Sequence, residues 1–155
     1  MADVTLVDVL TGARNTWGAY PALASVVPLT RVYAFGVPES VDYPNCVVEP
    51  GDVSAFFGGT EYYSGGQYQK TNKISFTVYA LAGTVNWPAL AQNLSDAFGW
   101  TSTAAAATWV IPNAVAVISS MPEVDEFKRT GERIDGLEIL SYKAQFSVKI
   151  QADRG

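Results

Sequence analysis

The chain has 155 residues, which fits one domain with a single hydrophobic core, because domains most often contain about 100 to 150 residues. Hydrophobic residues make up 48% and charged residues 16%, a balance that excludes an intrinsically disordered chain and implies a surface with few charges. Ten basic and fifteen acidic residues give a net charge of -5, which argues against general binding to the phosphate backbone of nucleic acids.

The first third of the chain predicts one helix followed by short strands. Apolar residues recur at spacings of three and four between Leu6 and Trp17, which indicates an amphipathic helix with Asp3 as its N-cap. Residues 31–35 and 45–49 are short runs of β-forming residues, so each predicts a strand.

Residues 51–72 combine five glycines with clustered aromatic residues, which are Phe56, Phe57, Tyr62, Tyr63 and Tyr68. A loop of this length is uncommon inside a compact domain and is usually functional. One interpretation is a twisted β-hairpin whose aromatic side chains pack on the same domain. The interpretation that we favour is a protruding arm whose aromatic side chains contact neighbouring subunits, because exposed aromatic surface is costly unless a partner covers it.

The middle of the chain predicts a strand that leads into a second helix. Apolar and polar residues alternate over 74–80, which is typical of a strand with one face on a core. Residues 87–98 carry an apolar stripe at helical spacing, with Asn86 as a suitable N-cap. Gly99 stands where a left-handed C-cap belongs, so we expect the helix to end there.

The last part of the chain predicts two strands joined by a charged connection. Residues 115–121 read as a strand that ends near Met121-Pro122. Residues 123–135 are dense in charge and predict a solvated connection of a hairpin. Residues 140–150 alternate between apolar and polar without exception, so they predict a strand long enough to cross a whole sheet.

This order of helices and strands predicts an α+β fold. We expect one mainly antiparallel sheet with two helices packed on one face, plus the long glycine and aromatic hairpin or loop at 51–72. The sequence contains no internal repeat and no linker between domains. Residues 1–155 are therefore expected to form one domain.

The residue types that catalysis and metal binding need are scarce. The chain has no histidine, which removes the commonest general base and the usual zinc ligand. The single cysteine, Cys46, is expected to be buried rather than reactive. Asp125 with Glu126, or Asp42 with Glu49, could form paired carboxylates, but solvated loops explain these positions better. We therefore expect no enzyme activity, no cofactor and no metal.

The sequence also argues against export and membrane insertion. The N-terminus lacks the basic region of a secretory signal, so we expect a protein that is made and used without export. The longest apolar stretch, 104–118, is interrupted by polar residues and proline, and it is shorter than the roughly 20 residues that span a bilayer. No membrane span is expected.

Acidic residues are concentrated in one part of the chain. Between Val32 and Gln69 there are five acidic residues and no basic residue; the acidic ones are Glu39, Asp42, Glu49, Asp52 and Glu61. One interpretation is a surface that only maintains solubility. The other is a negative face, such as the lumen of a ring, that keeps passing nucleic acid from binding.

The order of motifs along the chain resembles a known family. An N-terminal helix leads into Arg31-Val32-Tyr33, a proline-bearing loop and the segment Tyr-Pro-Asn-Cys-Val-Val at 43–48. A strand at 73–81 then leads into the helix at 87–98, and a charged turn precedes the long strand at 138–150. This layout, over nearly the whole chain, resembles the tail terminator, or tail completion, proteins of long-tailed bacteriophages, which include the minor tail protein U type.

The resemblance implies a structural virion protein of the phage tail or neck, made in the host cytoplasm. It implies a hexameric ring that ends polymerisation of the tail tube at its head-proximal end. The partners would be further copies of the chain, the tail tube protein, and a head-tail connector or head completion protein, and DNA would pass through without specific binding. A head-tail joining or tail-tube protein is the alternative within this class, and a small ligand-binding module or enzyme is the alternative outside it.

Overall fold

The computed structural model describes residues 4–50, 61–63, 67–99, 109–114 and 116–153 of the chain. Its helices are α1 (Leu6–Ala19), α2 (Pro21–Ala24), the 3-10 helix η1 (Leu29–Arg31) and α4 (Trp87–Phe98). Its strands are β1 (Val32–Tyr33), β2 (Asn45–Pro50), β3 (Glu61–Tyr63), β4 (Gln67–Leu81), β5 (Ala116–Ile134) and β6 (Leu137–Asp153).

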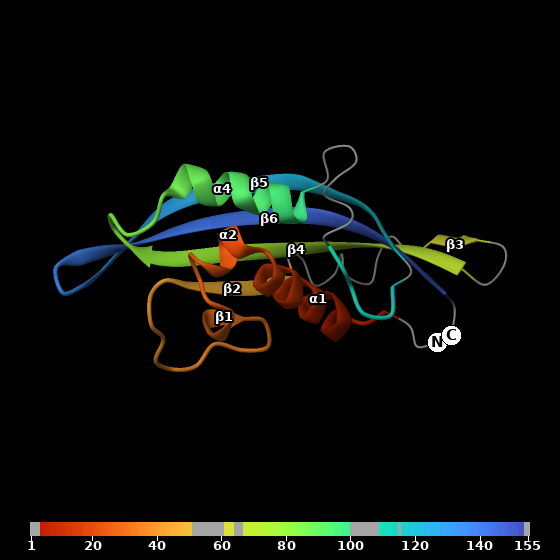
Figure 1. Ribbon diagram of the computed structural model, residues 1–155, viewed down its shortest axis with the longest axis horizontal. Coiled ribbons are helices and arrows are strands. Elements are labelled where there is room, and N and C mark those ends of the chain that lie inside the picture. Colours follow the sequence, from red (N-terminus) through yellow and green to blue (C-terminus); the bar gives the residue numbers. More distant parts are fainter. Residues whose placement is uncertain (1–3, 51–60, 64–66, 100–108, 115, 154–155) are drawn as a thin grey trace.

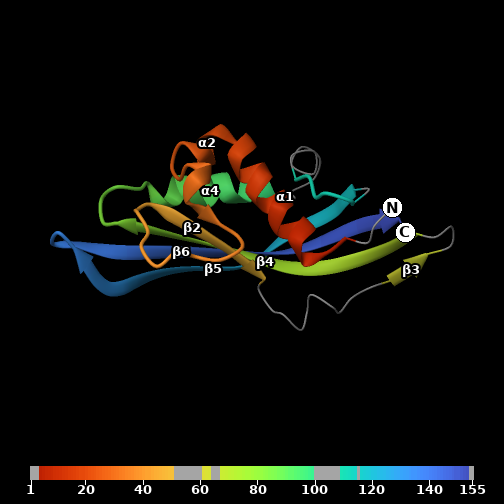
Figure 2. The same ribbon diagram turned by 90° about the horizontal axis from the view of Figure 1, so that it is seen from below.

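The described strands form one sheet in the order β1-β2-β4-β6-β5, and β3 pairs with β4 beside this path. Among these strands, β1 and β2 run parallel, and the other neighbours run antiparallel. Helices α1, α2 and α4 lie on the same face of the sheet (Figures 1 and 2). The structure therefore confirms the predicted α+β fold, with a mainly antiparallel sheet and its two long helices on one face.

Helix α1 begins at Leu6, directly after its N-cap residue, Thr5. The Asp8 backbone N–H donates to Thr5 Oγ1 at 3.3 Å, and the Thr5 backbone N–H donates to Asp8 Oδ2 at 2.9 Å. This reciprocal capping box satisfies two N–H groups at once, which a lone cap residue does not. The N-cap is therefore Thr5, and the prediction of Asp3 was wrong.

Helix α4 has the predicted bounds, but the backbone conformation at its C-terminal end differs from the prediction. Asn86 Oδ1 accepts a hydrogen bond from the Ala89 N–H at 3.1 Å, as expected for an N-cap. Gly99 has φ -82°, so the prediction of a left-handed C-cap was wrong. A Cβ at this position would lie 2.6 Å from the Ser95 carbonyl oxygen. Glycine is therefore needed here for close backbone approach rather than for a positive φ.

The two longest paired strands form the backbone of the sheet. The β4 strand pairs with β6 from Gln67 to Leu81, which at about 3.4 Å per residue gives a ladder roughly 50 Å long. The predicted strands at 74–80 and 140–150 lie within β4 and β6. The apolar positions of both segments face the helices and are buried, apart from the half-buried Leu140. The polar Ser75, Thr77 and Ser141 are buried as well.

Part of the glycine and aromatic segment at 51–72 belongs to the sheet. Strand β3 pairs antiparallel with the first residues of β4, and residues 67–72 lie within β4 itself. This much of the segment is a β-hairpin, as in the first of the two interpretations. Residues 51–60 and 64–66 lie outside the described residues.

Strand β5 is longer than the sequence pattern suggested. It continues through the charged residues to Ile134, so the prediction of a connection at 123–135 was wrong. The turn into β6 is Asp135-Gly136, with φ of 51° and 82°. Two successive positive φ values suit the two-residue turns that favour tight hairpins. A charged segment can remain a strand here because β5 is the outermost strand on its side of the sheet, where charge is common.

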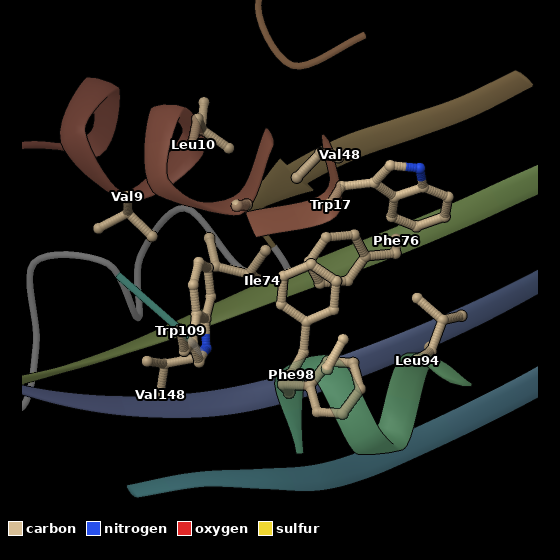
Figure 3. Packing of buried hydrophobic residues seen from close by; sticks show 14 of the residues in the cluster. Val9, Leu10, Trp17, Val48, Ile74, Phe76, Leu94, Phe98, Trp109 and Val148 are labelled. Carbon is tan, nitrogen blue, oxygen red and sulfur yellow. The ribbon is translucent and has the colours of Figure 1, made fainter. Parts of the chain in front are cut away.

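Aromatic rings from both helices and the sheet meet in the core (Figure 3). The Phe76 and Phe98 ring centroids are 4.2 Å apart, and Trp17 and Phe146 lie 6.2 Å and 5.9 Å from Phe76. Trp17 Nε1 donates to the Val27 carbonyl oxygen at 2.9 Å, so its polar end is satisfied inside the core. This cluster joins α1 and α4 to the middle of the sheet.

Candidate functional site

The aromatic residues predicted as subunit contacts fall into three groups. Phe56 and Phe57 lie outside the described residues. Tyr62 and Tyr63 belong to the short strand β3. Tyr68 is 5% exposed, and its hydroxyl accepts a hydrogen bond from the Val4 N–H at 3.0 Å. Tyr68 is therefore a core residue of its own chain, and its side chain offers almost no surface to a neighbour.

The acidic residues of the predicted negative face are spread along the molecule. Glu39, Asp42 and Glu49 are exposed, and Asp52 lies outside the described residues. Glu61 of β3 pairs with Gln69 of β4, and Glu49 of β2 pairs with Ser75, which lies six residues further along β4. At about 3.4 Å per residue this separates the two backbone positions by roughly 20 Å.

The described part of the sheet face opposite the helices carries both signs of charge. Lys73 Nζ lies 3.3 Å from Glu123 Oε2, and Gln145 Nε2 donates to the same carboxylate oxygen at 3.0 Å. Lys128 Nζ lies 3.3 Å from Glu126 Oε1. Such exposed pairs contribute little stability, but they neutralise one another locally. The charge at this part of the face is therefore mixed rather than uniformly negative.

A groove lies between α4 and β5 on the helix side of the sheet. Its volume is about 370 Å³, and its lining includes Ala91, Leu94, Pro122, Asp125 and Tyr142. Helix α4 forms one wall, β5 forms the other, and β6 forms the floor. The lining combines apolar side chains with polar ones, and it includes two carboxylates, Glu123 and Asp125, but no basic residue and no cysteine. This composition offers contacts to a side chain of a partner and lacks the clustered groups that a reaction needs.

The polar floor of this groove is a tyrosine and aspartate pair. Tyr142 Oη donates to Asp125 Oδ2 at 3.3 Å. Burial and the neighbouring Asp125 carboxylate raise the pKa of Tyr142 to about 12, so its hydroxyl stays protonated at neutral pH. Asp125 and Glu126 are successive residues of a strand and point to opposite faces, so they do not form the paired carboxylates considered from the sequence.

A second groove lies on the face of the sheet opposite the helices. Its volume is about 410 Å³, and its lining includes Val37, Val47, Tyr79, Glu132 and Ile139. Burial, and then the negative charge of a nearby glutamate, raise the pKa of Tyr79. The tyrosine therefore also stays protonated at neutral pH, and the groove presents an apolar floor with a hydroxyl group.

The cysteine was correctly predicted to be buried. Cys46 lies within β2 and is fully covered by the core, and this burial raises the pKa of its thiol. We expect a thiol-specific reagent at pH 8 to leave the folded protein unlabelled and to label one site per chain in denaturant. Rapid labelling of the folded protein, measured by absorbance or mass, would contradict the packing of β2 under the helices.

Most of the exposed large apolar residues in the described part of the chain lie at the two outer strands of the sheet; Val7 and Val110 lie elsewhere. On the β5 side they are Met121, Phe127, Ile134 and Leu137, and just after β1 they are Phe35 and Val37. Sequence analysis did not identify these residues as a group. The available signal was the presence of isolated apolar residues within the charged stretch at 121–137, which a purely solvated connection does not need.

The described residues show no site for a metal. Within the described ranges, no three histidine, cysteine or carboxylate side chains come close enough together to hold an ion. None of the helices that the structure describes has the length and apolar character needed to cross a membrane. In the described part of the chain, the two grooves and the two outer strands offer surface to a partner.

Comparison with solved structures identifies a protein of similar fold. No family model matches the sequence, and no curated protein matches it either. The chain is similar to a chain of the structure described as "Virion of native gene transfer agent (GTA) particle", with a TM-score of 0.61 and 17% identity. The similarity covers 96% of each of the two chains. At this identity the comparison shows a shared fold over nearly the full length.

Proposed function

We propose that this protein is a structural component of a phage-like virion, and that it forms a hexameric ring at the head-proximal end of the tail tube. In that position it ends polymerisation of the tube and joins the tail to the head connector. The observation that carries the proposal is the fold shared over 96% of both chains with a virion chain. The order of motifs that resembles tail terminator proteins supports the finer assignment.

The chemistry of the described surface supports a role that depends on contact. Its grooves contain apolar side chains and protonated tyrosines. Most of its exposed large apolar residues lie at two sheet edges, where a neighbouring protein can cover them. We therefore propose that the protein is not an enzyme and needs no cofactor, and that DNA passes through the ring without specific binding.

The mass of the isolated assembly tests this function. Each chain has a mass of 16.6 kDa, so a ring of six has a mass of about 100 kDa. We expect native mass spectrometry to show this species and electron microscopy to show single rings. Long stacks of rings would instead identify a tail-tube protein. A protein that remains monomeric at every concentration and does not bind to the ends of tail tubes would contradict the proposal.

A further inference from the structure

Three buried side chains contain polar atoms that have no hydrogen-bond partner in the part of the chain that the structure describes. They are Asn72 of β4, Ser120 of β5 and Trp109 of the segment 109–114. Asn72 and Ser120 are each 1% exposed, and Trp109 is 3% exposed. The atoms concerned are both the nitrogen and the oxygen of the Asn72 carboxamide, Nε1 of Trp109 and Oγ of Ser120. Because burying a polar atom unpaired is costly, such atoms normally have a partner, either protein or bound water.

The register of the sheet brings Asn72 and Ser120 into one row. Val148 of β6 pairs with Asn72 on one side and with Ser120 on the other. Paired residues of neighbouring strands direct their side chains to the same face. Val148 is fully buried on the helix side (Figure 3), so Asn72 and Ser120 also point to that side. Two strand spacings separate their Cα atoms by about 10 Å, which is too far for a direct hydrogen bond between two short side chains.

Trp109 lies close to this row, in the layer between the helices and the sheet. Its ring centroid is 5.1 Å from that of Phe98, and the Phe98 centroid is 6.3 Å from that of Phe146. Phe146 precedes Val148 by two residues and shares its face of β6. Figure 3 shows Trp109 and Val148 in the same part of the core. The indole N–H is therefore buried near the two strand residues.

The hydrogen-bonding capacity of these groups defines the ligand that they can bind. The amide nitrogen of Asn72 and the indole nitrogen of Trp109 donate, Asn72 Oδ1 accepts, and the Ser120 hydroxyl does both. A ligand for this set must donate and accept, and it must be small, because the interior is closely packed. None of the three side chains carries a charge, which disfavours an ion. Water meets these conditions, and a buried water typically makes about three hydrogen bonds.

We propose that the protein binds internal water between Asn72, Ser120 and Trp109, as a permanent part of each subunit. The segment 109–114 is already bonded to α1, because the Val110 N–H donates to Thr16 Oγ1 at 3.4 Å. The water joins the same segment to β4 and β5 of the sheet. The inference does not depend on the proposed ring, since all three residues belong to one subunit.

Nuclear Overhauser contacts between water and the indole N–H protons test this site in protein labelled with ¹⁵N at tryptophan. Trp17 is the matched control, because its indole N–H is buried in the same core but donates to the Val27 carbonyl oxygen at 2.9 Å. We expect a cross-peak with water, of the sign of a dipolar contact, for Trp109 and none for Trp17. A wild-type protein without the Trp109 cross-peak, or with equal cross-peaks at both residues, would overturn the proposal.

Substitutions of the strand residues identify the other groups that bind the water. Asn72→Leu removes both polar atoms at similar volume, and Ser120→Ala removes one hydroxyl, so the second variant remains available if the first does not fold. We expect the Trp109 cross-peak to fall at least fivefold in the first and at least twofold in the second. Ser75→Ala should leave it unchanged, because the buried Ser75 hydroxyl donates to the Glu49 carbonyl oxygen. An unchanged cross-peak in the folded Asn72 and Ser120 variants would show that the site is misassigned.

Discussion

Replacing Phe76 by alanine is expected to lower the free energy of unfolding by about 4 kcal/mol, in the range measured for buried aromatic residues. Phe76 is fully buried at the centre of the sheet. Its ring contacts Phe98 of α4, Trp17 of α1 and Phe146 of β6. Removing it leaves a cavity between all three elements, and the surrounding rings can relax only partly. Chemical denaturation followed by tryptophan fluorescence measures the change.

The matched control for this prediction is Val110→Ala. Val110 is 65% exposed and lies at neither outer strand, so shortening its side chain opens no cavity in the subunit. We expect a change below about 0.5 kcal/mol, as is usual for surface substitutions. Equal losses for the Val110 and Phe76 variants would show that the aromatic cluster does not hold the helices to the sheet, and the arrangement of the core would then be wrong.

Gly12→Ala is expected to destabilise the protein by about 2 kcal/mol, although alanine favours helices over glycine by about 1 kcal/mol. Gly12 lies inside α1, and a Cβ there would sit 2.5 Å from the Val110 carbonyl oxygen and 2.9 Å from Ile111 Cα. Both of these are backbone atoms, so relief requires the 110–111 segment to move away from the helix. A thermal melt compared with wild type measures the effect.

A second alanine substitution in the same helix separates packing from helix propensity. Asn15 is exposed in α1, and Asn15→Ala should raise the free energy of unfolding by a few tenths of a kcal/mol, because alanine is the better helix former. If Gly12→Ala stabilises the protein by a similar amount, then residues 110–111 do not pack against α1.

The elements that the sequence predicted well are those whose apolar pattern is determined by the core. Residues 74–80 and 140–150 lie in the middle of the sheet, so one face of each strand is buried and the alternation is strict. Helix α4 could be placed for the same reason. The first part of β5 was predicted, but its continuation through the charged residues was missed, because an outer strand owes its conformation to pairing with β6 and its exposed side chains need not alternate.

Short-range geometry explains the remaining errors. Helix α1 is capped by Thr5 because Asp8 can return the hydrogen bond, a reciprocity that a single cap residue does not reveal. The strand expected at 31–35 shrinks to Val32–Tyr33, since η1 occupies the residues before it. Gly99 is required by the position of the Ser95 carbonyl, which depends on how the helix ends.

The candidate contact surfaces were harder to predict than the fold. Tyr68 looked like an exposed aromatic residue of an arm, yet β4 carries it into the core. Phe127 attracted no attention in the sequence, because it stands alone among charged residues, and Phe35 was read only as part of a predicted strand. Their importance depends on which strands are outermost, and that follows from the pairing of segments distant in the chain. A periodicity within one segment contains no such information.

The enclosure of Cys46 has a consequence for the protein outside a reducing cell. The chain has one sulfur atom able to oxidise to a disulfide, and the core covers it completely. Oxygen therefore cannot oxidise the thiols of neighbouring folded copies to an intermolecular disulfide. The buried thiol is also shielded from peroxides. In the proposed ring, no disulfide between the native cysteines of this chain could therefore lock neighbouring copies together.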